Sequence, residues 1–266
     1  MNRQKFFEAV RAKPFGGSLT ETQVAGMNDL LDVCDRSGFT DLMWLAYILG
    51  GVFHEVGRRM VPVREGFAVT DAGARAAVAK LYKAGRISRN YAAPNAAGVS
   101  FYGRGRIQNT FEANYKKLEK RFGHPFTTKP DLLLDSKIDA EVTIYGHAEG
   151  IWTGKKLGDY FNANKADWKQ ARRIVNGLDK ADLIAGYAKA FHAALLRADD
   201  GTIQAVRPPP DIPAPEPPVA APQRPVQRPV ETVDDEADPI RETPVLRPAT
   251  GWAALLQAIV KALFGR

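Results

Sequence analysis

Two glutamates near the end of an apolar segment are the first candidates for chemistry. Glu55 and Glu65 lie in "WLAYILGGVFHEVGRRMVPVREGF", residues 44–67, with Pro62 between them. A carboxylate at the end of a buried helix is costly unless it faces a cleft or a partner. In a cleft with apolar walls one carboxyl can keep its proton at neutral pH while a second stays ionised. Such a pair supplies the acid and the base of glycoside hydrolysis.

A simpler interpretation gives neither glutamate a chemical role, and spacing alone favours it. Glu55 would cap its helix or pair with Arg58 or Arg59, and Glu65 would be a surface charge in a loop. Two further segments change the balance. "FYGRGRIQNTFEANYKKL" combines glycines, arginines, amides and a hydroxyl, and "ARRIVNGLDKAD" places Asn176 in a turn after an apolar pair. Polar groups on such turns can present hydrogen bonds to sugar hydroxyls.

Taken in this order with "AYILGGVFHEVGRRMVPVREGF", these segments resemble the signature segments of glycoside hydrolase family 19 over roughly residues 5–197. The family includes plant-type chitinases and many phage or prophage endolysins that cleave peptidoglycan. The resemblance implies a mainly α, lysozyme-like domain with two lobes around a cleft and a small β element. It also implies an inverting mechanism that needs neither a metal nor an organic cofactor.

The same resemblance implies roles for individual residues. Glu55 would donate a proton to the leaving glycosidic oxygen, Glu65 would activate the attacking water, and Thr110 would help to position that water. The residues expected to bind substrate are His54, Tyr102, Gln108, Asn114 and Asn176. Among them, His54 is expected only to support the neighbouring Glu55.

Three departures from the family pattern favour its bacterial and phage branch. Asn109 stands where the family usually has an apolar residue, often leucine, which bears on local packing. The run Val56–Arg58 replaces the small hydroxyl and glycine residues that follow "HE" in plant chitinases. The single cysteine, Cys34, excludes the disulfides of the plant enzymes and any intrachain disulfide, so the fold needs no oxidising compartment.

Metal chemistry finds no support in the sequence. The four histidines show no metal-ligand spacing, and "HEVGR" lacks the second histidine of a zinc-protease HExxH motif. The charge of the chain indicates an anionic partner. Residues 1–198 carry a net charge of +10 and residues 199–266 a net charge of −3. Because arginine and lysine are scattered along the chain, nucleic acid is less expected than anionic lipid or an acidic cell-wall polymer.

Helical patterns cover most of the first 198 residues. Helices are predicted over 20–38, with Thr20 as the N-cap and Gly38 as the stop, over 40–57 with Thr40 as the N-cap, and over 71–85 and 180–198. Residues 139–152 fit a helix or a strand, with the helix favoured. Glycines punctuate a short strand or hairpin at 98–108. Trp44 and Tyr47 are predicted to pack in the core. Trp152 and Trp168 could stack on sugar rings, but core packing is favoured for them as well.

Composition divides the chain into three parts. Residues 1–198 form the predicted catalytic domain. Residues 199–250 are predicted to be a disordered linker, since 13 of the 18 prolines lie between positions 208 and 248. Residues 251–266 show one apolar stripe and are predicted to be an amphipathic helix that contacts a membrane surface or docks on a partner. The start lacks a signal peptide, so we expect synthesis in the bacterial cytoplasm and action in the periplasm or cell wall after holin-type release or lysis.

The preferred hypothesis is an endolysin-type hydrolase of the β-1,4 bonds of peptidoglycan glycan strands. The first alternative is a chitinase that acts on chitin oligomers. The second is a non-catalytic module that binds the cell wall or builds a virion.

Overall fold

Seven α-helices and four short 3-10 helices together make up more than half of residues 1–199, the part of the chain that this computed structural model describes. The α-helices are α1 (Arg3–Ala12), α2 (Glu21–Ser37), α3 (Leu42–Glu55), α4 (Asp71–Lys83), α5 (Glu112–Phe122), α6 (Ser136–Glu149) and α7 (Ala181–Ala198). The mainly α class is therefore confirmed. The predicted amphipathic helix at 251–266, and the predicted linker from residue 200 onward, lie outside the described residues.

Short elements join the helices. The 3-10 helices are η1 (Glu65–Phe67), η2 (Pro130–Leu134), η3 (Leu157–Asp159) and η4 (Gln170–Ile174), and the strands are β1 (Val63–Arg64), β2 (Arg104–Gly105), β3 (Phe161–Asn162) and β4 (Lys165–Ala166). β1 pairs antiparallel with β2, with Val63 opposite Gly105, and β3 pairs with β4. The extended element expected within 98–108 is confirmed. Its main partner is the segment after α3, which brings that segment beside the "GRGRIQ" turn.

The capping residues of α2 and α3 can be compared with those predicted from the sequence. Thr20 caps α2 in a capping box with Gln23, and Gly38 ends the helix at φ 66°, as predicted. The N-cap of α3 is Asp41 and not Thr40. The Asp41 carboxylate accepts hydrogen bonds from the backbone N–H groups of Met43 (2.8 Å) and Trp44 (3.0 Å). One carboxylate oxygen thus serves two donors at the helix start.

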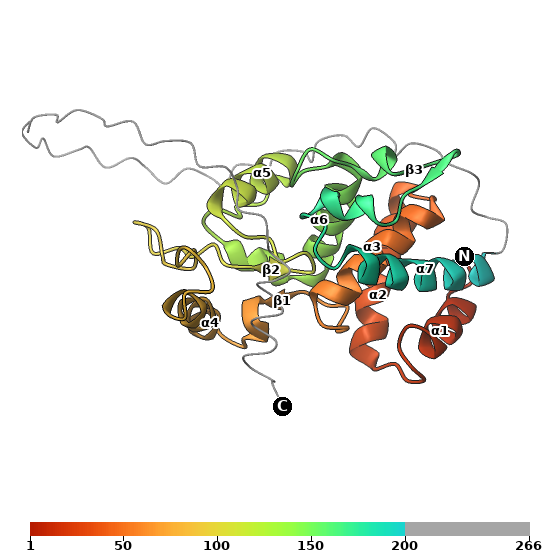
Figure 1. Cartoon of the computed structure of the whole chain (residues 1–266), viewed down its shortest axis with the longest axis horizontal. Coiled ribbons are helices and arrows are strands. Elements are labelled where there is room, and N and C mark those ends of the chain that lie inside the picture. The colour runs from red at the N-terminus through yellow and green to blue at the C-terminus, as the bar shows by residue number, and fades with distance from the viewer. Residues whose placement is uncertain (200–266) are drawn as a thin grey trace, which may run out of the picture.

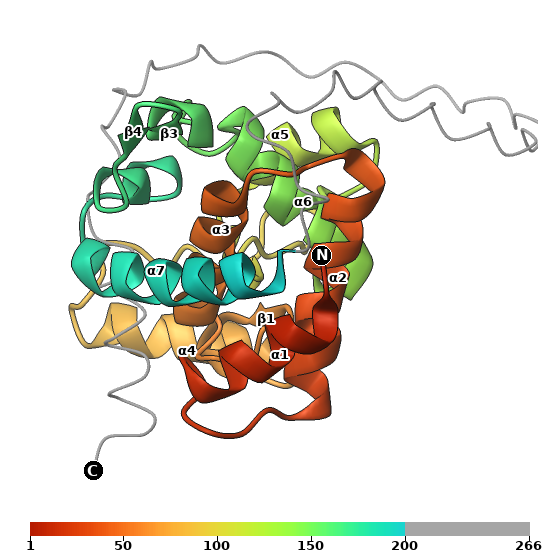
Figure 2. The same cartoon turned by 90° about the vertical axis from the view of Figure 1, so that its right-hand side faces the viewer.

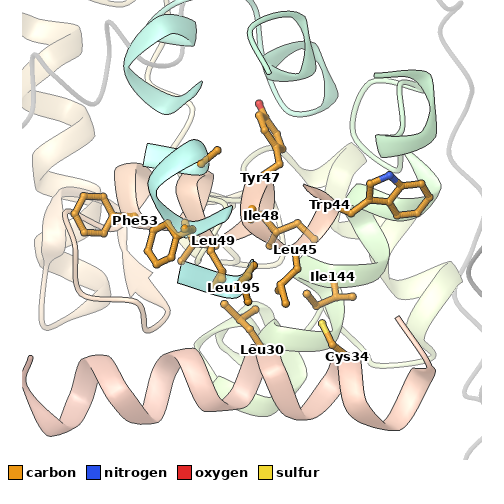
Figure 3. Packing of buried hydrophobic residues seen from close by; sticks show 14 of the residues in the cluster. Leu30, Cys34, Trp44, Leu45, Tyr47, Ile48, Leu49, Phe53, Ile144 and Leu195 are labelled. Atoms are coloured by element: carbon orange, nitrogen blue, oxygen red, sulfur yellow. The ribbon is translucent and has the colours of Figure 1, made fainter. Parts of the chain in front are cut away.

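α3 lies at the centre of the main hydrophobic cluster (Figure 3). Leu45, Ile48 and Leu49 face Leu30 of α2 and Leu195 of α7. Although α3 is almost entirely apolar, no helix within residues 1–199 has the combination of length and apolarity needed to cross a membrane.

A glycine sets the distance between α3 and α7. A Cβ atom on Gly50 would lie 2.6 Å from the backbone nitrogen of Ala188, so only glycine permits this approach of the two helices. Because both helices are buried against each other, the C-terminal end of α3, which carries Glu55, is firmly placed.

Two smaller hydrophobic clusters lie away from α3. One joins α4 to the turn formed by residues 101–110, and its buried members are Ala74, Val78, Ala92 and Tyr102. The other surrounds α5. Figure 1 shows α4 on one side of the molecule and α1 and α7 on the other, with β1 and β2 between them, and Figure 2 gives the view at a right angle. Glu55 and Glu65 are therefore positioned by different packing units.

Candidate functional site

Glu55 is the last residue of α3 and forms a buried ion pair. Its side chain is 5% exposed, and Oε1 lies 2.7 Å from Nη1 of Arg172, an equally buried residue of η4. The partner is neither Arg58 nor Arg59, so the simpler sequence interpretation named the wrong arginines. Arg172 Nε donates to the carbonyl of Asp179 (3.3 Å), while its Nη2 has no hydrogen-bond partner within residues 1–199. An unused buried donor therefore stands beside Glu55.

Glu65 begins η1 and is 3% exposed, so it is not a surface loop charge. Its Oε2 accepts a hydrogen bond from the backbone N–H of Gly103 (2.8 Å), and its Oε1 accepts one from the hydroxyl of Tyr91. Burial raises the pKa of Glu65, and the bonds from Tyr91 and Gly103 act in the opposite direction. The structure thus gives Glu65 a dry environment with two fixed donors.

Gln108 and Thr110 meet Glu65 around Gly103. A Cβ atom on Gly103 would lie 2.8 Å from Gln108 Oε1 and 3.3 Å from both Glu65 Oε2 and Thr110 Oγ1. Gln108 is anchored because its Nε2 donates to the carbonyls of Val63 (3.1 Å) and Gly105 (2.9 Å). The Thr110 hydroxyl donates to the carbonyl of Gln108 (3.1 Å). Three residues that the resemblance selects are thereby brought together.

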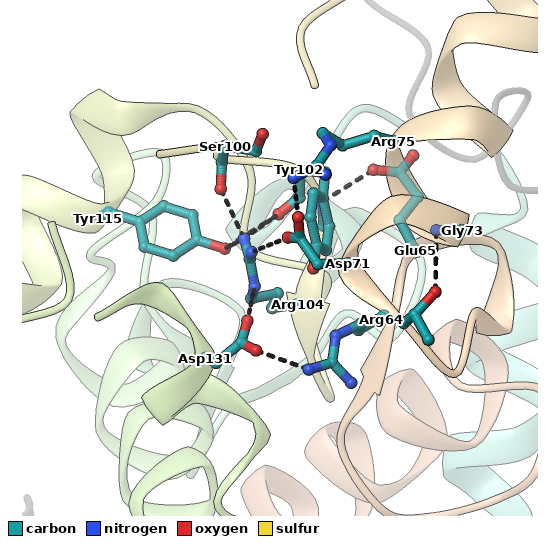
Figure 4. Close-up of polar contacts among 12 residues, drawn as sticks. Arg64, Glu65, Asp71, Gly73, Arg75, Ser100, Tyr102, Arg104, Tyr115 and Asp131 are labelled. Carbon is teal, nitrogen blue, oxygen red and sulfur yellow. Dashed lines mark hydrogen bonds and ion pairs between the residues drawn. The ribbon is translucent and has the colours of Figure 1, made fainter. Parts of the chain in front are cut away.

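Arg104 holds the chain next to Gly103 in place through several polar contacts (Figure 4). Its guanidinium donates to Asp131 (2.7 Å), to Asp71 (3.2 Å) and to the carbonyl of Ser100 (2.8 Å). It also lies 3.6 Å from the ring centroid of Tyr102. Tyr102 is 0% exposed. In this state Tyr102 offers no surface to a ligand, so the expected place in a cleft wall would require the side chain to move.

Arg106 fixes the other side of the turn. This fully buried residue donates from Nε to the carbonyl of Met60 (2.8 Å) and from Nη1 to Asp139 (3.0 Å). Its Nη2 reaches Ser136 Oγ (2.8 Å) and Asp29 (3.2 Å). The turn is thus tied to α2, to α6 and to the segment after α3. The sequence analysis grouped both arginines with the polar residues that present hydrogen bonds to sugar, whereas the structure buries them as anchors of the turn.

The remaining predicted residues lie near one or the other glutamate. Asn114 donates from Nδ2 to the carbonyl of Thr110 (2.8 Å). Asn176 accepts from the next backbone N–H through its Oδ1 (2.8 Å), and its own N–H donates to the carbonyl of Arg172 (3.0 Å). His54 is half-buried next to Glu55, and burial lowers its pKa. Asn114 therefore belongs to the Glu65 side, and Asn176 and His54 to the Glu55 side.

Asn109, the departure from the family pattern, has a structural explanation. It is buried, and its Oδ1 accepts a hydrogen bond from Trp152 Nε1 (2.7 Å). The polar residue at this place therefore satisfies an indole N–H next to the main cluster. Trp44 and Tyr47 are buried in the core as predicted, and Trp152 and Trp168 are partly buried against it.

The two glutamates belong to separate networks. No hydrogen bond or ion pair among residues 1–199 joins Glu55 or Arg172 to Glu65 or Tyr91. A small open hollow of about 170 Å³ lies between the end of α2 and the start of α3, and none of the predicted site residues lines it. Its lining residues are Met1, Leu31, Cys34, Asp35, Gly38, Phe39, Thr40, Leu42 and Leu45. The described part of the chain holds no group of three or more His, Cys, Asp and Glu side chains that could bind a metal ion.

Unusual backbone conformations gather around both networks. Non-glycine residues with positive φ cost about 1–3 kcal/mol each and concentrate at functional sites. The described residues contain six, and five of them flank Glu55, Glu65 or the turn: Arg58, Met60, Phe67, Gln108 and Phe111. The segments that carry the predicted site therefore contain backbone conformations that lower the stability of the fold.

No protein-family model, characterised protein or solved structure that we compared with the chain matches it.

Proposed function

We propose that residues 1–198 form a lysozyme-like glycoside hydrolase domain that cleaves the β-1,4 bonds of peptidoglycan with inversion. The observation that carries the proposal is the meeting of Glu65, Gln108 and Thr110 around Gly103. These residues come from two segments far apart in the sequence, and the motif resemblance selects them without any knowledge of the fold. The buried Glu55 supplies the second carboxyl that the reaction needs.

The base role fits the surroundings of Glu65. An inverting hydrolase holds a water between its base and the sugar. Glu65 Oε2 and Thr110 Oγ1 each lie 3.3 Å from the point that a Cβ atom of Gly103 would occupy, so a water bound between these two side chains could contact both oxygens. Burial raises the pKa of Glu65, and the bonds from Tyr91 and Gly103 oppose this effect by favouring the ionised carboxylate, which is the form that accepts a proton.

The acid role requires that Glu55 carries a proton when the glycosidic oxygen arrives. An arginine in direct contact opposes protonation, so Arg172 must give up this pair during the reaction. Its unpartnered Nη2 offers a route. Because Nη2 is buried, a sugar hydroxyl or acetamide oxygen can accept from it only after the surrounding side chains move; that bond would then draw the guanidinium toward the substrate and free Glu55.

The two roles can be separated with an activated aryl β-glycoside, whose leaving group needs no proton. We expect Glu55→Gln to hydrolyse this compound while losing activity on natural glycan. We expect Glu65→Gln to lose both activities and to regain turnover with azide, which replaces the activated water and gives an α-glycosyl azide. The opposite pattern would exchange the roles of the two glutamates.

The substrate is tested by digesting purified peptidoglycan and chitin oligomers in parallel and analysing the products by mass spectrometry. Release of muropeptides with a cleaved glycan strand is the expected result. Cleavage of chitin oligomers alone would favour the chitinase alternative. Absence of cleavage, with the protein still sedimenting with cell walls, would favour a non-catalytic wall-binding module.

A further inference from the structure

Positive charge concentrates in residues 56–99, the chain between the end of α3 and the buried turn. This segment has eight arginines and lysines against two acidic residues, a net charge of +6 out of the +10 carried by residues 1–198. Of the two acidic residues, Glu65 is buried, and Asp71 pairs with Arg75 and Arg104. This segment includes α4, which lies on the opposite side of the molecule from α1 and α7 (Figure 1), and it begins near α1, where Arg58 donates a hydrogen bond to the carbonyl of Phe15.

Two exposed arginines of this segment lie one aromatic ring away from the Glu65 network. The guanidinium of Arg59 lies 4.0 Å from the ring centroid of Phe67, the residue that ends η1. Arg89 lies 4.7 Å from the ring centroid of Phe111. The Phe111 ring in turn lies 5.5 Å from that of Tyr91, whose hydroxyl binds Glu65.

The aromatic contacts hold these two charges in place without neutralising them. A guanidinium on a ring face keeps its N–H groups free for a bidentate acceptor such as a carboxylate. None of the ion pairs within residues 1–199 involves Arg59 or Arg89. Each arginine therefore presents a positioned, solvent-accessible positive charge that aromatic contacts connect to the Glu65 network.

We propose that Arg59 and Arg89 bind carboxylates carried by the glycan itself, so that the preferred substrate is a carboxylated β-1,4-glycan and not a neutral one. Peptidoglycan carries carboxylates on the lactyl groups or stem peptides of alternate sugars, whereas chitin carries none. The inference rests on the proposed function for its link to Glu65, but the binding step itself needs no hydrolysis.

The test uses one wall material in two charge states. Peptidoglycan sacculi freed of other wall polymers are compared with the same sacculi after carbodiimide coupling has converted their carboxylates to neutral amides. Co-sedimentation of the full chain is measured at low salt for the wild type, for R59Q/R89Q and for R11Q/R197Q, a control that removes two exposed arginines from α1 and α7.

We expect the wild type and the control to bind native sacculi about tenfold more tightly than amidated sacculi, roughly threefold for each arginine. We expect R59Q/R89Q to lose this preference. The preference should also vanish near ~1 M salt, where the screening length falls to about 3 Å.

Equal binding of the two sacculi by the wild type, or a preference retained by R59Q/R89Q, would overturn the inference. Equally tight binding of duplex DNA would also overturn it, because the surface would then recognise any polyanion. Initial hydrolysis rates on the same sacculi are recorded in parallel. A binding preference without hydrolysis would refute the proposed function and leave the carboxylate site standing.

Discussion

Glu65 depends on its neighbours for its chemistry, since burial and hydrogen bonding act on it in opposite directions. Burial raises the pKa of the carboxyl, whereas the Tyr91 hydroxyl and the Gly103 N–H stabilise its ionised form. A base must be ionised to act, so the acid limb of a pH–activity profile reports this balance.

Tyr91→Phe removes one of the two donors. The pKa of Glu65 should then rise further, and the acid limb of the pH–activity profile should move to higher pH with little change on the alkaline side. Tyr82→Phe, which alters an exposed tyrosine of α4, should leave the profile in place. An acid limb unchanged in Tyr91→Phe would argue against Glu65 as the base.

Gly103→Ala places a methyl group among the oxygens of Glu65, Gln108 and Thr110. The backbone of Gly103 is not at positive φ, so the change should fold, with Gln108 forced to shift from the 2.8 Å approach. We expect turnover of peptidoglycan to fall at least about tenfold, corresponding to about 1.4 kcal/mol, because water placement is disturbed. Thermal unfolding measured beside activity separates the two effects; full activity would place the attacking water elsewhere.

Motif reading found the residues whose types the proposed reaction needs, and it missed those that hold them in place. Thr110 and Gln108 follow from the "GRGRIQNT" pattern, and the structure places both beside Glu65. Arg172 and Tyr91 gave no such signal, because an arginine in "ARRIVNG" and a tyrosine in a loop are ordinary surface residues in a sequence. Only long-range packing brings them to the glutamates.

At the scale of elements, the turn at 101–110 is the unit that assembles the Glu65 side. All ten residues are buried, and Arg104 and Arg106 anchor them to α2, α4, α6 and η2. Residue patterns predicted α2, α3, α4 and α7 and favoured a helix over a strand at α6, and glycine spacing predicted the extended turn. The sequence analysis predicted no helix at α1. The N-cap of α5 is Phe111, which has φ 69° and makes no side-chain cap hydrogen bond, so no N-terminal signal marks that helix.

Gly105→Ala tests how the turn docks. Gly105 has φ +88°, and a Cβ atom there would lie 2.1 Å from Asp139 Oδ1, which binds the backbone N–H of Arg106. Gly98→Ala is a matched control, since Gly98 has φ +76° and nothing within 4 Å of the added atom. We expect Gly98→Ala to lower the free energy of unfolding by about 1 kcal/mol and Gly105→Ala by about 3 kcal/mol.

Chemical denaturation of both glycine variants measures the difference. Equal losses of stability would mean that Asp139 adjusts freely and does not fix the position of the turn.

At the scale of the whole molecule, the two glutamates rest on separate packing units, and residues 56–99, the segment with the highest net charge, join these units. The start of the segment packs with α3 and α7, which hold Glu55, and its later part packs with α4, beside Glu65. The net charge of the chain predicted an anionic partner, but the sequence did not show which arginines lie on aromatic rings, because those contacts depend on the fold.

The apolar stripe of residues 251–266 leads to a prediction about the whole chain that depends on sequence alone. A labelled peptide of this segment should partition into vesicles of anionic lipid and gain helical content there, because the stripe buries apolar surface at the interface. A peptide of the same composition in scrambled order should bind less. Equal partition of the two peptides, or none, would remove the membrane from the list of partners.

The central claim is that Glu55 and Glu65 act as the acid and the base of one hydrolytic reaction, and turnover of purified peptidoglycan by Glu55→Gln and Glu65→Gln tests it most directly. Each change keeps the shape of the side chain and removes its ionisable proton. With folding verified by circular dichroism, since Glu55→Gln also leaves Arg172 without its ionic partner, both variants should lose about 10²–10⁴-fold in rate. Lysis of the wall by either folded variant at the wild-type rate would contradict the account.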